Sequence, residues 1–100
     1  MVATRQVNKQ EEILGVGRLI KVHGVNEGEF AIVISDQWQG QGLGTYLLKL
    51  ILDIGRQEGL ERIVGHILPD NYGMQRVCKK LGFALNYDDF ADDMKAEITL

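Results

Sequence analysis

Apolar and polar positions along the chain change period several times, and each change predicts an element. Residues 13–22 ("ILGVGRLIKV") alternate and predict a strand whose apolar face is formed by Leu14, Val16, Ile20 and Val22. The continuously apolar run Phe30–Ile34 predicts a central strand that is covered on both faces.

From Leu43 onward the apolar period becomes helical. This predicts a helix that ends near Gly59 and whose apolar face holds Leu43, Leu47, Leu50, Ile51 and Ile54. A second helix is expected after Asp70 or Asn71, either of which would cap it, and Gly82 would end it. Further strands are expected over Arg62–Leu68, Phe83–Leu85 and Glu97–Leu100. This order predicts an α/β (α+β) mixed-sheet sandwich, with a parallel strand–helix–strand unit in its middle.

Composition narrows the class of protein. The 100 residues predict a single domain over 1–100, and the net charge of −3 with no basic stripe argues against a nucleic-acid partner. No apolar stretch approaches the roughly 20 residues that span a bilayer, so no membrane partner is expected. The single cysteine and the polar N-terminus predict a cytoplasmic location.

Three glycines, Gly40, Gly42 and Gly44, stand where the first helix begins. A loop that opens a helix directs unpaired N–H groups at one point, and bare glycines allow a phosphate to approach them. The spacing G-x-G-x-G differs from the dinucleotide and Walker-type motifs. The loop therefore predicts an anion site, with a glycine-rich turn that binds no ligand as the alternative.

Two motifs resemble a known family. The stretch "QGQGLG" from Gln39 to Gly44 is similar to the Q/R-x-x-G-x-G/A signature of the GNAT superfamily of N-acetyltransferases. The stretch from Asn71 to Phe83, an Asn-initiated helix closing in Gly-Phe, resembles the second acetyl-CoA motif of that family. The resemblance covers Ile13 to Leu100 and is nearest to the bacterial protein-lysine acetyltransferase branch. It implies a GNAT acyl-CoA N-acyltransferase fold that lacks most of the usual N-terminal strand and helices.

The resemblance implies acetyl-CoA as cosubstrate and assigns its contacts. The backbone of Ile32, Val33 and Ile34 would bond the pantetheine arm, and one N–H there would stabilise the oxyanion. Asn71 would also bond the pantetheine, or would serve only as a helix cap. The pyrophosphate would be held by a loop of seven residues: Gln39, Gly40, Gln41, Gly42, Leu43, Gly44 and Thr45.

Acetyl transfer requires a neutral amine, and a lysine with a pKa near 10.4 is protonated at pH 7, so a base is useful. The resemblance makes Glu29 the catalytic candidate and Glu27 the reserve, and the alternative is that both are solvated carboxylates. We expect His66 to be a satisfied buried histidine and His23 a turn residue, and no metal site is expected.

A proton donor for the leaving thiolate is harder to assign. The position that often carries a tyrosine in this family is Cys78, which falls on the apolar stripe and is expected to pack in the core. Tyr72 and Tyr87 are weak substitutes. Coenzyme A thiolate, the conjugate base of a thiol with a pKa of about 8.5, also leaves without much help.

The leading hypothesis is an acetyl-CoA-dependent N-acetyltransferase that acts on a primary amine, of a protein lysine or a small molecule, by direct attack in a ternary complex. The first alternative is a non-catalytic acyl-CoA-binding or regulatory module of the same fold. The second is an α/β interaction domain without a ligand. Because few residues precede the first expected strand, a homodimer that covers the exposed cleft is also expected.

Overall fold

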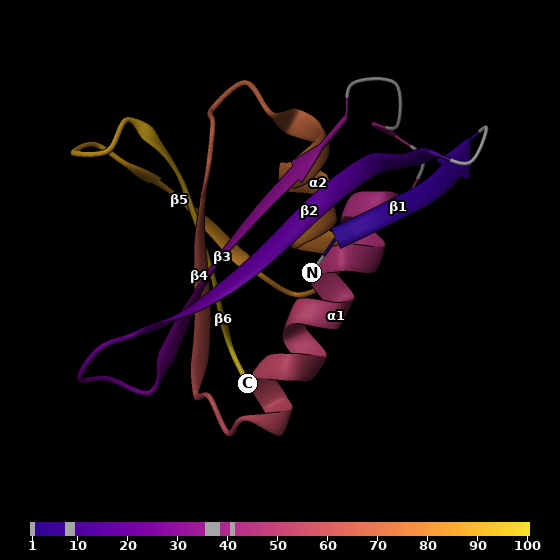
Figure 1. The fold of residues 1–100 in the computed structure, drawn as a ribbon. Coiled ribbons are helices and arrows are strands. Elements are labelled where there is room, and N and C mark those ends of the chain that lie inside the picture. The colour runs from indigo at the N-terminus through magenta and orange to yellow at the C-terminus, as the bar shows by residue number, and fades with distance from the viewer. Residues whose placement is uncertain (1, 8–9, 36–38, 41) are drawn as a thin grey trace.

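The structure is a computed structural model that describes residues 2–7, 10–35, 39–40 and 42–100 (Figure 1). The predicted order of strands and helices is confirmed, with one strand added at the N-terminal end that the sequence analysis missed. The elements are β1 Val2–Val7, β2 Gln10–Val22, β3 Glu27–Ile34, α1 Leu43–Gln57, β4 Arg62–Ile67, α2 Tyr72–Lys80, β5 Ala84–Asp88 and β6 Asp93–Thr99.

The strands form one six-stranded sheet in the order β1-β2-β3-β4-β6-β5. β3 and β4 are parallel, as predicted for the strand–helix–strand unit, and the other neighbours are antiparallel. A parallel pair needs a long crossover connection, and α1 supplies it. The sheet therefore has two antiparallel halves that meet at a single parallel seam.

Both helices pack against the same face of this sheet. The core joins Leu48 and Ile51 of α1 and Cys78 of α2 to Phe30 and Ile63 on the strands. In Figure 1 the two helices accordingly lie together on one side of the strands. No described element covers the opposite face, which we call the open face and which includes Glu29, Ala31 and Val33 of β3.

Two face assignments from the sequence were wrong. On β2, Gly15, Gly17 and Leu19 face the core side, whereas Ile20 is 63% exposed on the open face. On β3, Val33 is 69% exposed, so this strand is covered on one face and not on both. The β2 error arose because the glycines on its core side contribute no apolar signal, and the β3 error arose because its apolar run includes Ala31 and Val33, which are exposed.

The seam between β3 and β4 is short. Its register runs over four pairs, from Glu27 opposite Arg62 to Phe30 opposite Gly65. β3 continues to Ile34 and stays paired with β2 up to Gly15, while β4 continues beside β6. The two strands therefore part after Phe30 and Gly65, at what we call the vertex.

Helix α1 buries Leu47, Leu48, Ile51, Leu52 and Gly55. This stripe differs from the predicted one, since Ile54 is exposed. The helix reaches Glu58 as its C-cap, and Gly59 takes a positive φ of 73° just beyond it, as the predicted terminator should. In the described part of the chain, no helix is both long and apolar enough to cross a membrane.

Candidate functional site

The glycine loop is shaped by backbone conformation. Gly40 and Gly42 have φ values of 78° and 83°, in the left-handed region that side chains with a Cβ atom disfavour. Apart from its chain neighbours, no atom of the described residues lies within 4 Å of a Cβ atom built at either position. Gly44 is glycine for another reason, since its Cβ would lie 3.2 Å from the terminal methyl of Met74 on α2. Gln41 lies outside the described residues.

The N-terminus of α1 has no side-chain cap. Its N-cap is Gly42, and the first N–H to find a helical carbonyl is that of Tyr46, at 3.0 Å from the Gly42 oxygen. The preceding N–H groups of Leu43, Gly44 and Thr45 stand at the positive end of the helix, and its first turn carries no acidic residue. This end of α1 is thus suited to an anion.

Helix α2 begins beside this loop. Its N-cap is Asn71, whose side-chain oxygen accepts a hydrogen bond from the Met74 N–H at 3.2 Å. The capping alternative for Asn71 is therefore present in the structure. The side-chain amide group remains available, because the cap uses only the oxygen atom.

A groove of about 390 Å³ lies between the loop, the end of β3 and α2. Of the residues assigned to the cosubstrate from sequence, the groove is lined by Ile32, Ile34, Gln39, Gly40, Gly42, Gly44, Thr45 and Asn71. Val33 points its side chain to the open face, and Leu43 is half-buried outside the lining. The structure thus brings together two motifs that are about thirty residues apart in the chain.

The groove also has lining residues that the sequence analysis missed, all on α2: Gly73, Met74, Arg76, Val77 and Lys80. Arg76 and Lys80 stand one helical turn apart, and both side chains are exposed. Neither forms an ion pair with another described residue, so two positive charges face the groove. Gly73, Arg76 and Lys80 are spaced so that they share one face of α2, and this spacing could have identified the two residues from the sequence.

The backbone of β3 faces the gap between the strands at alternate residues. The Ser35 N–H donates to the Leu14 oxygen at 2.9 Å, which fixes the hydrogen-bonded positions between β2 and β3. Because such positions alternate, the polar groups of Val33 point to β2, while those of Ile32 and Ile34 point into the gap. The Ile34 oxygen accepts from the Gln39 side chain at 3.3 Å.

Two glutamates lie on the open face of β3 and differ in their partners. Glu27 stands 3.9 Å from Arg62, which also pairs with Glu97 at 3.1 Å. Glu29 is exposed and forms no ion pair within the described chain. It stands opposite Val64, one pair before the vertex. Glu29 is thus the freer carboxylate and the one nearer the vertex.

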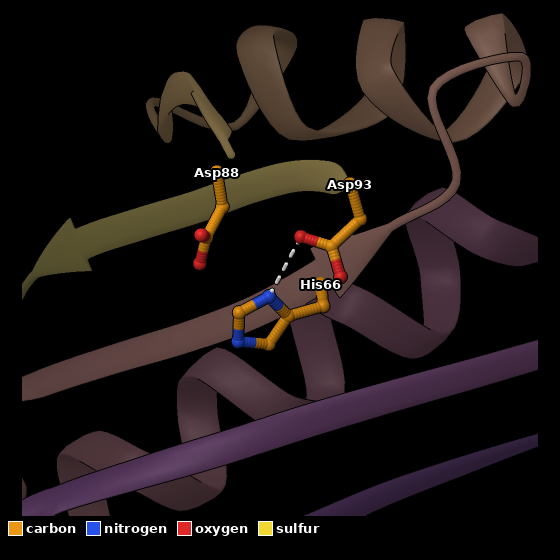
Figure 2. A group of neighbouring side chains, drawn as sticks. All are labelled: His66, Asp88 and Asp93. Carbon is orange, nitrogen blue, oxygen red and sulfur yellow. Dashed lines mark hydrogen bonds and ion pairs between the residues drawn. The ribbon is translucent and has the colours of Figure 1, made fainter. Parts of the chain in front are cut away.

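His66 is the first residue of β4 beyond the vertex, and the expectation that it is buried was wrong. Its side chain is 36% exposed, and Nδ1 lies 3.0 Å from Oδ1 of Asp93, a carboxylate that is only 16% exposed. Figure 2 shows His66 turned toward Asp93, with Asp88 on the neighbouring strand, and one polar atom of each lies within 4.8 Å of the others. No local pattern in the sequence links His66 to Asp93, because the two residues are 27 positions apart.

The other proton donors considered from sequence lie elsewhere. Cys78 is fully buried in the core, as predicted, and burial raises the pKa of its thiol to about 12. The Tyr87 hydroxyl bonds the Asp92 carboxylate, and this bond, with smaller effects from burial and nearby acids, raises its pKa. Tyr72 is exposed at the start of α2, and His23 lies in the β2–β3 turn as predicted.

Two acetyltransferases are similar to this chain in sequence. Acetyltransferase Pat of Mycolicibacterium smegmatis is 28% identical over 60 residues, which cover 60% of this chain and 18% of that protein. Acetyltransferase PA5475 of Pseudomonas aeruginosa is 29% identical over 70 residues, which cover 70% of this chain and 38% of that protein. The aligned part of the chain therefore covers well under half the length of either relative.

Solved structures share the fold. The protein yncA of Salmonella typhimurium, solved with its cofactor acetyl-CoA, aligns with a TM-score of 0.75 at 22% identity, over 88% of this chain and 58% of that one. The GNAT domain of S. lividans PAT aligns with a TM-score of 0.76 at 24% identity, over 89% of this chain and 55% of that one. A family model described as an acetyltransferase (GNAT) domain matches residues 2–84. The chain belongs to the GNAT family of acetyltransferases.

Proposed function

We propose that this protein transfers the acetyl group of acetyl-CoA to a primary amine, of a protein lysine or a small molecule, by direct attack in a ternary complex. The observation that carries the proposal is the groove, because one cavity collects a helix end suited to an anion, two positive side chains and an edge of β3 beyond its pairing with β4. An acyl-CoA molecule presents phosphates, amides and a thioester, which are the groups that these features match.

Each part of the groove would hold a different part of the cosubstrate. The N–H groups at the start of α1, with Arg76 and Lys80, would bind phosphates by charge-assisted hydrogen bonds. The free edge of β3 at Ile32 and Ile34 would bond the pantetheine amides as a neighbouring strand does. Asn71 would add its side-chain amide.

The acceptor would reach the thioester from the open face, because the groove lies on the helix-covered face. Glu29 stands on that open face next to the vertex and would take the proton of the incoming ammonium, directly or through water. An N–H group of the β3 backbone at the gap, such as that of Ile32, would stabilise the oxyanion. The amine would then attack the thioester carbonyl and the thiolate would leave.

Two measurements test the proposal. Calorimetry with acetyl-CoA should show saturable binding, and thiol release with a panel of primary amines should show turnover. The Glu29→Gln variant should bind acetyl-CoA normally but turn over about 100-fold or more slowly, which is the usual contribution of a general base. The matched control is Glu61→Gln, an exposed carboxylate in the α1–β4 connection. Unchanged turnover in Glu29→Gln would refute the assignment of the base.

Cys78 favours a second candidate function, because it stands at the position expected for a proton donor and is buried in the core. A non-catalytic acyl-CoA-binding or regulatory module would bind acetyl-CoA in the same groove without releasing thiol in the presence of any amine. Binding without turnover would therefore support the module, and the absence of binding at millimolar acetyl-CoA would refute both functions.

A homodimer and a cytoplasmic location remain predictions. The open face supports the first, because Ile20 and Val33 are strongly exposed there and no described element covers them. Light scattering at micromolar concentration should give the mass of two chains. A monomeric mass would contradict the dimer without affecting the proposed activity.

A further inference from the structure

We propose that His66, oriented by Asp93, carries a proton from the attacking nitrogen to the leaving sulfur. This inference rests on the proposed acetyl transfer and concerns a second proton. After a neutral amine attacks, its nitrogen must still lose a proton, and the departing thiolate must gain one. A group that accepts and then donates a proton near neutral pH serves both needs, and histidine is the side chain suited to it.

His66 lies next to the point where acetyl-CoA and the amine acceptor would meet. It follows Gly65, which forms the last pair of the seam with Phe30. Its neighbours Gly65 and Ile67 are buried on the core side, so the exposed His66 side chain stands on the open face. The groove is lined by Ile32 and Ile34, which follow Phe30 on β3, and the acceptor would approach from the open face. The vertex is therefore where nitrogen, carbonyl carbon and sulfur would come together.

The contact with Asp93 selects one form of the imidazole ring. With Nδ1 at 3.0 Å from the carboxylate, the neutral ring carries its proton on Nδ1 and donates it to Oδ1. The lone pair is then on Nε2, and Figure 2 shows this atom on the side of the ring away from Asp93. Because Asp93 is mostly buried in its hairpin, its carboxylate is a fixed partner and not a mobile surface charge.

Other charged groups surround the pair. Asp88 of β5 lies in the same cluster, but its Oδ1 accepts from the N–H groups of Phe90 and Ala91 at 3.0 and 3.2 Å. Lys95 of β6 is the register partner of His66 and stands 4.0 Å from Glu97. Glu29 faces the same region from β3. Asp93 is thus the acid that bonds the ring directly.

The step balances as follows. The ammonium first loses one proton to Glu29, and the neutral amine forms the new carbon–nitrogen bond. Nε2 of His66 takes the second proton from that nitrogen, which leaves a positively charged ring beside the Asp93 carboxylate. The carbon–sulfur bond then breaks, and the proton passes from Nε2 to the sulfur to give the free thiol. His66 returns to its neutral form, Glu29 releases its proton to water, and no oxidant or reductant is needed.

The test compares three variants with two controls. His66→Gln should reduce kcat for a lysine-containing peptide by about 100-fold while leaving the KM for acetyl-CoA unchanged, since general acid–base groups contribute on this scale. The matched control His23→Gln alters the other histidine, which lies in the β2–β3 turn, and should behave as wild type. Because both side chains are exposed, circular dichroism and calorimetry with acetyl-CoA should show folded, binding-competent proteins.

Asp93 is a positioning residue, so its test includes a readout that does not depend on activity. In wild type, nitrogen-15 spectra of the neutral His66 ring should show the proton on Nδ1. Asp93→Asn should give the other tautomer or a mixture, and kcat should fall. Asp88→Asn, which removes the neighbouring charge but not the bond to the ring, should leave both the tautomer and kcat unchanged.

The outcomes separate this inference from the function on which it rests. A wild-type protein without turnover for any amine would overturn both. Turnover that depends on Glu29 but stays within about threefold of wild type in His66→Gln would overturn the role of His66 alone. In the variant with both Glu29→Gln and His66→Gln, the combined loss should be smaller than the product of the two single losses, because the groups act in one reaction sequence. A strictly multiplicative loss would contradict the shuttle.

Discussion

The ring of Phe30 occupies the space that a side chain at Gly65 would need. A Cβ atom added at Gly65 would lie 2.4 Å from Cε1 of Phe30 and 2.5 Å from Cζ. The same ring makes an edge contact with Phe83, with ring centroids 5.4 Å apart. Phe30 and Gly65 form the last pair of the seam. At the point where the strands part, the large Phe30 ring therefore packs over a residue that has no side chain.

The first prediction concerns this pair. Gly65→Ala should lower the free energy of unfolding by about 1–3 kcal/mol, because the Phe30 ring must move in a close-packed core. Chemical denaturation measures the change. Gly73→Ala is the control, since its Cβ would meet only an Asn71 side-chain atom at 3.9 Å. Equal stability of Gly65→Ala and wild type would show that the core tolerates the displaced ring.

The second prediction concerns the positive charges on α2. Arg76→Gln and Lys80→Gln should each weaken acetyl-CoA binding by about tenfold, because each would remove a charge-assisted hydrogen bond to a phosphate. The loss should shrink as salt rises, since exposed charges are screened. Calorimetry measures the affinity, and Lys79→Gln, on the same helix but outside the groove lining, is the control. Equal losses in all three variants would indicate a general charge effect.

The third prediction separates the two roles of Asn71. A serine at this position can still cap α2 but has no amide group to donate, so Asn71→Ser should keep the stability and weaken acetyl-CoA binding. Asn71→Ala should weaken binding and also lose about 1 kcal/mol of stability. Thermal denaturation and calorimetry provide the two readouts. Normal binding by both variants would leave Asn71 as a helix cap only.

The fourth prediction uses the buried thiol. Cys78 should resist alkylation at pH 8 in the folded protein and react once the chain is unfolded, because the thiolate is the reactive form. Burial raises its pKa from 9.0 to about 12, so between these values the unfolded state releases a proton that the folded state keeps. Stability should therefore fall as pH rises through this window. In Cys78→Ala this part of the pH dependence should disappear, as denaturation curves at several pH values would show.

The elements of this fold were readable from the sequence because periodicity and turn residues are local signals. The boundaries of α1, β4 and α2 agree closely with the apolar pattern and with the glycines at 59 and 82. The missed strand β1, "VATRQV", has no regular alternation to reveal it. The orientation of β2 was misread because Gly15 and Gly17 mark its buried face by having no side chain.

The candidate site was predictable only as far as its motifs extend along the chain. The glycine loop and Asn71 were found because each belongs to a contiguous pattern, and the groove brings them together. The pairing of His66 with Asp93 joins segments 27 residues apart across two antiparallel strands, so it depends on register and not on a local motif. Arg76 and Lys80 are exposed residues off the apolar face of α2, so the hydrophobic period does not mark them.

The short seam between β3 and β4 also bears on the order in which the molecule folds. The β1–β2–β3 meander and the β5–β6 hairpin each pair strands that are neighbours in sequence, so they close small loops. The four seam pairs instead join segments separated by the whole of α1. Contacts of this kind slow folding, because a long loop must close before they stabilise anything. The vertex that organises the site is therefore expected to be among the last parts of the sheet to assemble.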